Sequence, residues 1–283
     1  MVLESLINPW NAEKHPKTML LYGFIYASLG FFLGLWVFNE HASLIMVFLT
    51  TMAAIPLIYN IIKVEEKKDL VFHSEKGLLK EHSRALRVFL NYFIGTTLAF
   101  AFWYIVLPNS TIISAFEVQA NTINSLRANV TGNASYLGRI FFEILSNNLK
   151  VLIFCILFSF LYGVGAAFIL TWNASVIGVA IGDTIKTGIL QISEKFHITT
   201  SHQYFGVITY GLLRYIIHGV PEILAYFVAG LAGGIISSAV IRHDFGTKKY
   251  EKIILDSSVL LLISLVLIVI AAFLEVYVTP TLF

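Results

Sequence analysis

The stretch VLIFCILFSFLYGVGAAFILTWNASVIGVAIG, from Val151 to Gly182, contains 32 residues and no charged side chain. A helix needs about 20 apolar residues to cross the hydrocarbon core of a bilayer, which is about 30 Å thick. This stretch is too long for a single crossing helix, so it must break. The polar sequence TWNAS, from Thr171 to Ser175, is the predicted break.

The composition extends this reading to the whole chain. Of the 283 residues, 57% are hydrophobic and 13% are charged, and the mean hydropathy is +0.79. Soluble domains carry about a quarter charged residues, so we expect an all-α fold, a polytopic membrane helical bundle. The formal net charge of +2 is too small to indicate a nucleic-acid partner. The single cysteine, Cys155, excludes a disulfide within the chain.

Five further segments are apolar and long enough to cross a bilayer. They are residues 19–38, 42–62, 88–107, 223–241 and 257–278. Segments 175–190 and 204–219 are interrupted by glycine, and the second is only about 24 Å long as a helix. Such segments occur where backbone lines a cavity in transporters, so we predict broken or re-entrant helices near Asn173 and Gly219. The alternative is one ordinary short span and one interfacial helix.

The basic residues predict the orientation. Lysines and arginines gather before the first span, between the second and third, and before the last. Placing all three groups in the cytoplasm obeys the positive-inside rule and requires about seven crossings, with the N-terminus inside and the C-terminus outside. The loop 108–147 is then external. Its triplets at Asn109, Asn129 and Asn133 are candidates for N-glycosylation.

The chain divides into residues 1–87, a transmembrane hairpin followed by a charged cytoplasmic segment, and residues 88–283, a core membrane domain. The charged segment, residues 63–87, interleaves seven basic with five acidic residues. This pattern is typical of a solvated helix face, and the alternative is a docking surface for a cytoplasmic partner.

Polar residues inside apolar segments are the candidate functional residues, because they are costly there. They are Asn147, Asn148, Asn173, Asp183, Arg214, His218, Glu222 and Glu275. The sequence shows no phosphate loop, nucleophile elbow or paired-cysteine metal motif. His218 and Glu222 have a spacing that can share a metal, but two ligands are too few. We therefore predict no enzymatic activity, no metal and no cofactor.

Pro221 and Gly219 weaken the helix between His218 and Glu222. With the helix kinked or restarted there, the imidazole can hydrogen-bond the carboxylate. We expect Arg214, His218 and Glu222 to point inward as a structural polar clasp. The alternative is a proton-responsive or substrate-responsive site.

Several glycines have spacings that let helices approach closely. They are Gly30 and Gly34 in the first span, and Gly230 and Gly234 after the motif HGVPE at residues 218–222. Gly219, within this motif, is a further packing candidate. Packing within the chain is the preferred interpretation, and a homodimer face is the alternative.

Three stretches together resemble the stage II sporulation protein M family. They are NNLKVLIFCILFSFLYGVGAAFILTWNASVIGVAIG, HGVPEILAYFVAGLAGG and AAFLEVYVTP. The N-terminal region resembles the archaeal members, which carry an extra hydrophobic hairpin. The positions that match the family pattern are Asn147, Asn148, Asn173, His218, Gly219, Glu222 and Glu275.

The resemblance implies a polytopic membrane protein without catalytic activity. In spore-forming bacteria the family works with peptidoglycan-degrading partners in membrane engulfment. We expect a multi-pass component of the cell membrane that acts through protein partners in envelope or membrane remodelling. The alternatives are a transporter, channel or lipid-moving protein, and an intramembrane hydrolase that uses His218 and Glu222.

Overall fold

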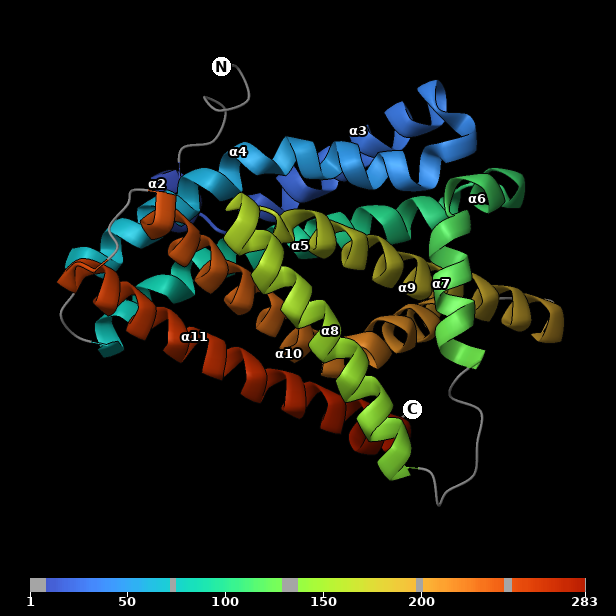
Figure 1. Ribbon diagram of the computed structural model, residues 1–283. Coiled ribbons are helices and arrows are strands. Elements are labelled where there is room, and N and C mark those ends of the chain that lie inside the picture. The colour runs from blue at the N-terminus through green and yellow to red at the C-terminus, as the bar shows by residue number, and fades with distance from the viewer. Residues whose placement is uncertain (1–8, 72–74, 129–136, 197–200, 242–245, 283) are drawn as a thin grey trace.

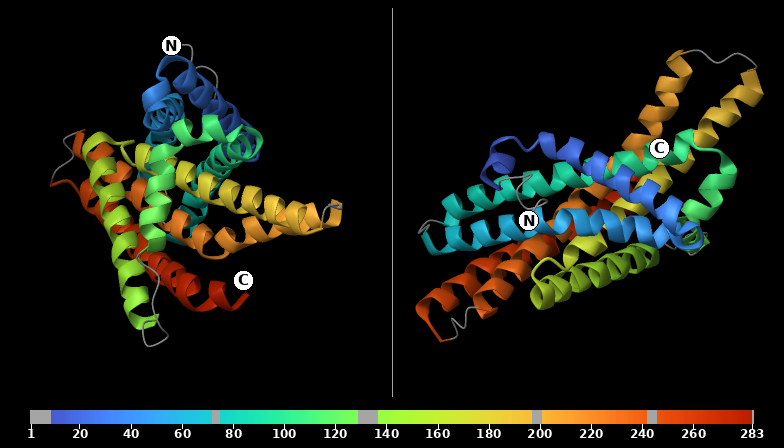
Figure 2. Two further views of the ribbon diagram at one scale, coloured as in Figure 1. Left: turned by 90° about the vertical axis from the view of Figure 1, so that its right-hand side faces the viewer. Right: turned by 90° about the horizontal axis from the view of Figure 1, so that it is seen from above.

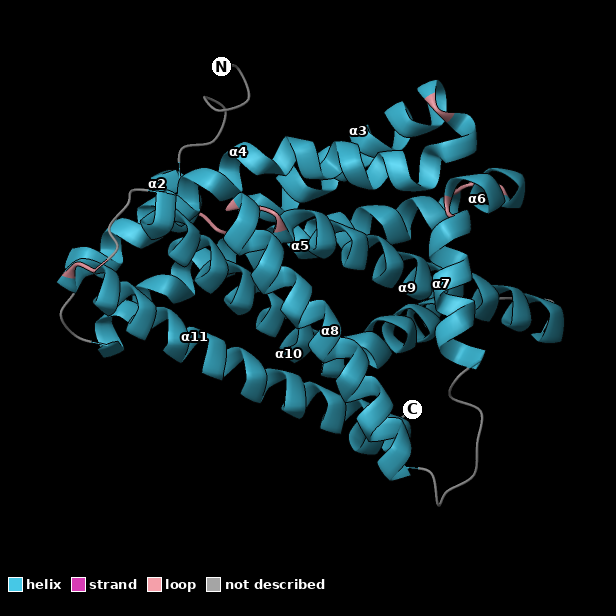
Figure 3. Ribbon diagram, in the orientation of Figure 1, coloured by secondary structure: helices cyan, strands magenta, loops and turns pink. Residues whose placement is uncertain are grey.

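The computed structural model describes residues 9–71, 75–128, 137–196, 201–241 and 246–282, and every regular element in these ranges is a helix (Figures 1 and 3). Seven of these helices are long and apolar enough to cross a membrane. They are α3 (Thr18–Val37), α4 (Ala42–Val71), α5 (Glu75–Val106), α8 (Leu137–Tyr162), α9 (Ala166–Phe196), α10 (Ser201–Ile241) and α11 (Lys248–Phe273). The predicted all-α bundle with seven crossings is confirmed.

Short elements complete the chain at the ends of the long helices. They are α2 (Pro9–Lys14), the 3-10 helix η1 (Asn39–His41), α6 (Asn109–Ala115), α7 (Glu117–Ala128), the π-helix η3 (Leu274–Val278) and α12 (Thr279–Leu282). Helices α6 and α7, with the start of α8, occupy the segment that the sequence predicts as a loop. They fold over one end of the bundle, where Ile112 and Phe116 are buried against α3, α5 and α9.

Helix α10 is the central element. Its second half, from Ile223 to Ala239, is almost entirely buried, and the helix packs against α8, α9 and α11. A helix that is apolar on all sides is stable only when neighbours surround it. The hairpin of α3 and α4 packs on the other side, where α3 lies against α5 and α5 lies against α9.

The predicted break at Thr171–Ser175 is wrong. Helix α8 ends at Tyr162, Gly163 adopts φ 66°, and α9 runs unbroken from Ala166 through Asn173. Glycine takes this left-handed conformation without steric cost, so the YGVG sequence is the actual turn signal. The Asn173 amide is satisfied within the helix, because its Nδ2 donates to the carbonyl of Ile169 at 2.8 Å.

The predicted break near Gly219 is also wrong, because α10 continues through Gly219 and Pro221 for 41 residues. The segment 204–219 is the first half of this helix and not a separate short span. Pro221 lies at the middle of α10, and Figure 2 shows that the helix changes direction along its length. A proline removes one backbone hydrogen bond and crowds the carbonyl four residues before it, which bends a helix without ending it.

The two ends of the bundle differ in charge. One end, which we call the basic end, contains α2, the end of α4, the start of α5 and the start of α11 (Figure 1). The opposite end, the far end, contains η1, α6, α7, α12 and the facing ends of α9 and α10. The described basic residues that the sequence assigns to the cytoplasm lie in α2, in the turn before α3, in the facing ends of α4 and α5, and at the start of α11.

Candidate functional site

The polar residues of the HGVPE motif contact the C-terminal end of the chain. The Nδ1 atom of His218 lies 3.2 Å from Oγ1 of Thr279, the first residue of α12. One turn after His218 on α10, Oε1 of Glu222 accepts a hydrogen bond of 2.9 Å from the hydroxyl of Tyr226. The carboxyl groups of Glu222 and Glu275 lie close enough to interact electrostatically. Two intramembrane glutamates and a histidine therefore form one site, which we call the α10–η3 site.

A π-helix gives Glu275 its place in this site. After Phe273 the chain widens into η3, which begins with Leu274 and Glu275, and it then continues into α12. A π-helical turn inserts one extra residue into a helix and so rotates the side chains that follow; such turns occur frequently at functional sites. The rotation brings Thr279 to His218 on the neighbouring helix.

The α10–η3 site lies at one end of a long apolar segment on each of its two helices. The segment from Glu222 to Ile241 is about 30 Å long as a helix, and the apolar part of α11 that precedes Glu275 is about 27 Å long. The side chains of His218, Glu222 and Glu275 are partly exposed. This exposure reduces the energetic cost of the two carboxyl groups.

Arg214 and Asp183 stand apart from the hydrogen-bonded part of this site. The Arg214 side chain is exposed, so the expectation that it points inward is wrong. It precedes His218 by one helical turn, where the bundle no longer surrounds α10. Asp183 on α9 accepts a hydrogen bond of 3.4 Å from the hydroxyl of Tyr104. The neighbouring Lys186 donates to the carbonyl of Leu107 at 2.9 Å and so caps the end of α5.

The two adjacent asparagines on α8 face different surroundings. Asn148 is buried, and within the described part of the chain its Nδ2 has no hydrogen-bond partner. Asn147 is exposed, on the same side of the helix as Glu143 and Lys150. We call Arg139, Glu143, Asn147 and Lys150 the α8 polar stripe. Beyond it, from Ile153 to Leu161, the exposed residues of α8 are mostly apolar.

The chemistry open to the α10–η3 site is proton or ligand exchange by carboxyl and imidazole groups. Among the residues that the structure describes, no three histidine, cysteine or acidic side chains are grouped to hold a metal ion. Cys155 is a free, buried thiol on α8.

The predicted packing glycines are not all alike. A Cβ atom at Gly30 would lie 2.6 Å from Oγ1 of Thr50, and one at Gly34 would lie 3.3 Å from the backbone of Met46. Gly230 and Gly234 similarly face Ala166 and the carbonyl of Gly163. These four contacts are within the chain. A Cβ atom at Gly219 would meet open space, so Gly219 does not serve helix packing.

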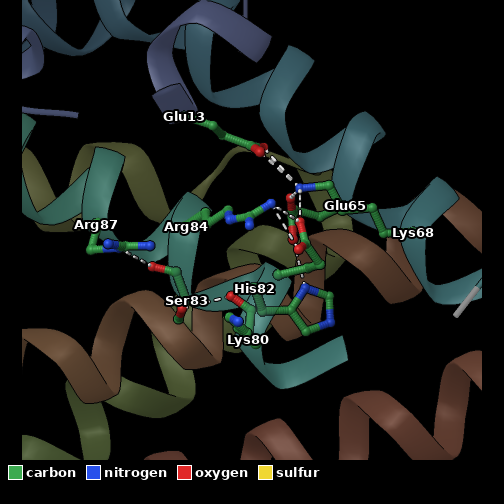
Figure 4. Close-up of polar contacts among 9 residues, drawn as sticks. Glu13, Glu65, Lys68, Lys80, His82, Ser83, Arg84 and Arg87 are labelled. Atoms are coloured by element: carbon green, nitrogen blue, oxygen red, sulfur yellow. Dashed lines mark hydrogen bonds and ion pairs between the residues drawn. The ribbon is translucent and has the colours of Figure 1, made fainter. Parts of the chain in front are cut away.

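A buried ion network at the basic end was not predicted. Lys68 on α4 bonds Glu65 at 2.6 Å and Glu13 of α2 at 2.9 Å, and Glu65 also contacts Nδ1 of His82 on α5 at 2.7 Å (Figure 4). Glu65 is 0% exposed and His82 is 2% exposed. The prediction of a solvated face is therefore wrong for these residues. Interleaved opposite charges on two antiparallel helices pair with each other across the hairpin.

The network also fixes the short helix α2. Burial raises the pKa of the Glu13 carboxyl, although its hydrogen bond to Lys68 acts in the opposite direction. The exposed pair Arg84–Glu81 lies at the edge of the same cluster, at 2.8 Å. In the sequence, only the interleaved charges of residues 63–87 indicate this network. Glu13 could not be assigned to it, because it comes from the distant helix α2.

Of the candidate glycosylation positions, the structure describes one. Asn109 is the first residue of α6 and is exposed. Asn129 and Asn133 lie outside the described residues.

A family model described as Stage II sporulation protein M matches residues 88–280. An uncharacterized protein of Methanocaldococcus jannaschii is 31% identical over 187 residues, which is 65% of this chain and 89% of that protein. No solved structure matches. The family match begins within α5, so α2, α3 and α4 precede it.

Proposed function

The chain belongs to the stage II sporulation protein M family, and from this membership we propose that it is a non-catalytic scaffold of the cell membrane that acts through partner proteins in envelope or membrane remodelling. The basic end faces the cytoplasm in this proposal, following the positive-inside rule. The far end, with the α10–η3 site, then faces outward.

The observation that supports the proposal is the α8 polar stripe. Helix α8 is the least buried of the seven long helices, since only 22% of its most apolar segment is covered by the rest of the described chain. Its exposed apolar residues suit lipid, whereas Glu143, Asn147 and Lys150 do not. An exposed polar face within a crossing helix is stabilised by water or by a partner that supplies hydrogen bonds. The stripe therefore gives the scaffold a surface for a partner.

Site-specific crosslinking in the native membrane tests this proposal. A photoreactive amino acid at Asn147 or Lys150 should give a discrete adduct with another protein. Leu161 is an exposed apolar residue of the same helix and serves as the matched control, which should give lipid adducts only. Replacing Glu143 and Lys150 by alanine should remove the protein adduct formed at Asn147. Equal adducts at Asn147 and Leu161, or none at either, would contradict the proposal.

A second candidate function is proton-coupled transport, favoured by the proximity of Glu222 and Glu275 beside His218. Its test is proton flux into proteoliposomes. Transport predicts that His218→Gln, which keeps a hydrogen bond to Thr279 but does not titrate, folds normally and abolishes the flux. The scaffold proposal predicts no flux through the wild-type protein and a stable, partner-binding His218→Gln variant.

A further inference from the structure

A groove lies between the last turns of α9 and the first turns of α10, at the far end. Its volume is about 570 Å³, which is within the usual range of small-molecule sites. The side chains that line it and can form hydrogen bonds are Asp183, Thr184, Thr187, Gln191, Gln203 and Tyr210. Gly206 of α10 also lines the groove and faces open space, whereas Gly188 of α9 packs against Val207 and holds the two helices together beside it. It is separate from the α10–η3 site, which lies beyond Arg214 toward the bundle.

We propose that this groove binds a neutral, polyhydroxylated group, such as a sugar or a polyol headgroup. Its lining offers two amides, two aliphatic hydroxyls, a phenol and a carboxylate. Together these groups can both donate to and accept from neighbouring hydroxyls, and Tyr210 adds an aromatic face. A ligand with many hydroxyls can use donors and acceptors of this mixed set at the same time.

The charges of the lining favour a neutral ligand over an anionic one. No lysine, arginine or histidine is among the residues that line the groove in the described structure. The nearby Lys186 instead donates to the carbonyl of Leu107. A phosphate or carboxylate ligand would face Asp183 without a compensating cation.

The surroundings of the groove favour a lipid as the source of this headgroup. The same part of α10 exposes Phe205, Ile208, Leu213 and Ile216. Helices α9 and α10 project together from the bundle here (Figure 2), and their lengths of 31 and 41 residues exceed the thickness of a bilayer core. An exposed apolar face next to a polar groove suits a molecule with acyl chains on one side and hydroxyls on the other. A free sugar is the other source of the same chemistry.

The full-length protein in phosphatidylcholine nanodiscs tests the proposal. The two probes are a diglucosyl dialkylglycerol, measured by native mass spectrometry, and free maltose, measured by saturation-transfer NMR. Gly206→Trp fills the groove, because a Cβ atom at Gly206 meets open space. Gly138→Trp, also placed in open space but on α8, is the matched control. The double variant Gln191→Ala with Gln203→Ala removes two amides without adding bulk.

We expect the glycolipid to bind the wild-type protein and Gly138→Trp with equal affinity. Its affinity should fall at least about tenfold in Gly206→Trp, which fills the groove, and in the double alanine variant, which removes hydrogen bonds to the ligand. Binding of the glycolipid alone identifies a lipid headgroup, and equal binding of maltose identifies a free sugar. The proposal is overturned if neither probe binds, if Gly206→Trp binds as well as Gly138→Trp does, or if phosphatidylglycerol displaces the glycolipid. None of these results depends on the scaffold role.

Discussion

At the scale of single residues, Glu222 stabilises the fold through Tyr226. The Tyr226 side chain is 0% exposed, and its hydroxyl donates to Glu222. Glu222→Ala removes the acceptor and leaves a buried hydroxyl unpaired, at a cost of about 1–3 kcal/mol. Thermal unfolding in detergent should show a lower midpoint than for the wild-type protein. Glu251→Ala, at an exposed position in the first turn of α11, is the control and should unfold like the wild type. Equal midpoints for the two variants would contradict this role.

Glu13 makes a prediction about pH. Burial raises the pKa of the Glu13 carboxyl group, so this group binds a proton more tightly in the folded protein than in the unfolded chain. The stability that Glu13 contributes is then complete below the pKa of the unfolded chain and is lost as the pH rises through the pKa of the folded protein. Lowering the pH from neutral to mildly acidic should stabilise the wild-type protein relative to Glu13→Gln, because the other carboxyl groups are common to both. The measurement is the difference in unfolding midpoint against pH. A difference that is constant or shrinks on acidification would refute it.

The sequence predicts only part of each site at this scale. His218 and Glu222 could be placed on one helix face because their spacing is a helical repeat. The predicted hydrogen bond between them is wrong, because His218 contacts Thr279 and Glu222 accepts from Tyr226. Thr279 and Glu275 could not be joined to them, since the contact depends on the π-helical turn in η3. The network of Lys68 with Glu13 was missed for a related reason, because 55 residues separate its members.

At the scale of helices, the contact between α3 and α5 joins the N-terminal hairpin to the matched family region. Gly95 of α5 lies against the backbone of Leu20, and Gly23 of α3 lies against the carbonyl of Tyr92. Gly95→Ala places a methyl group against a backbone that cannot yield, so we expect a loss of about 1–3 kcal/mol. Gly138→Ala is the control, since its methyl group meets open space and alanine favours a helix by about 1 kcal/mol. Thermal unfolding of both variants gives the comparison, and a Gly95→Ala variant as stable as Gly138→Ala would show that the contact is dispensable.

The bend of α10 supports a second prediction at this scale. Pro221→Ala restores the backbone hydrogen bond to Ile217 and removes the clash with its carbonyl. Spin labels at Phe205 and Ile241, both exposed, report on the two ends of the helix. The distance between the labels should lengthen in Pro221→Ala. An unchanged distance would assign the bend to packing against α9 and α11.

Helix ends explain why the two predicted breaks were misplaced. Asn173 led to the prediction of a helix break because an unpaired amide is costly in hydrocarbon. Its amide instead donates to the carbonyl of Ile169 on its own helix. The actual turn depends on Gly163, whose positive φ only glycine adopts readily. Proline and glycine around residue 220 bend α10 without ending it, because neighbouring helices hold both halves.

At the scale of the whole molecule, the number of crossings was predictable from composition and length alone. In the hydrocarbon core every backbone N–H and C=O group must be hydrogen-bonded within the protein, so an apolar crossing segment forms a helix of about 20 residues. The helices α6 and α7 were not predictable, because their polar sequence is typical of a loop. They are held on the bundle by the burial of Ile112 and Phe116. The groove between α9 and α10 was not predictable either, since it depends on helices that extend beyond the bilayer core.

The scaffold proposal requires the α10–η3 site and the α8 polar stripe to face away from the cytoplasm. Single cysteines in a Cys155→Ser background test this sidedness with a membrane-impermeant maleimide, applied to right-side-out and inside-out vesicles. The exposed positions are Lys80 at the basic end, and Gln191 and Thr281 at the far end. We predict that Gln191→Cys and Thr281→Cys are labelled only in right-side-out vesicles and Lys80→Cys only in inside-out vesicles. Labelling of Lys80→Cys from outside, or of Lys80→Cys and Thr281→Cys from the same side, would contradict the account.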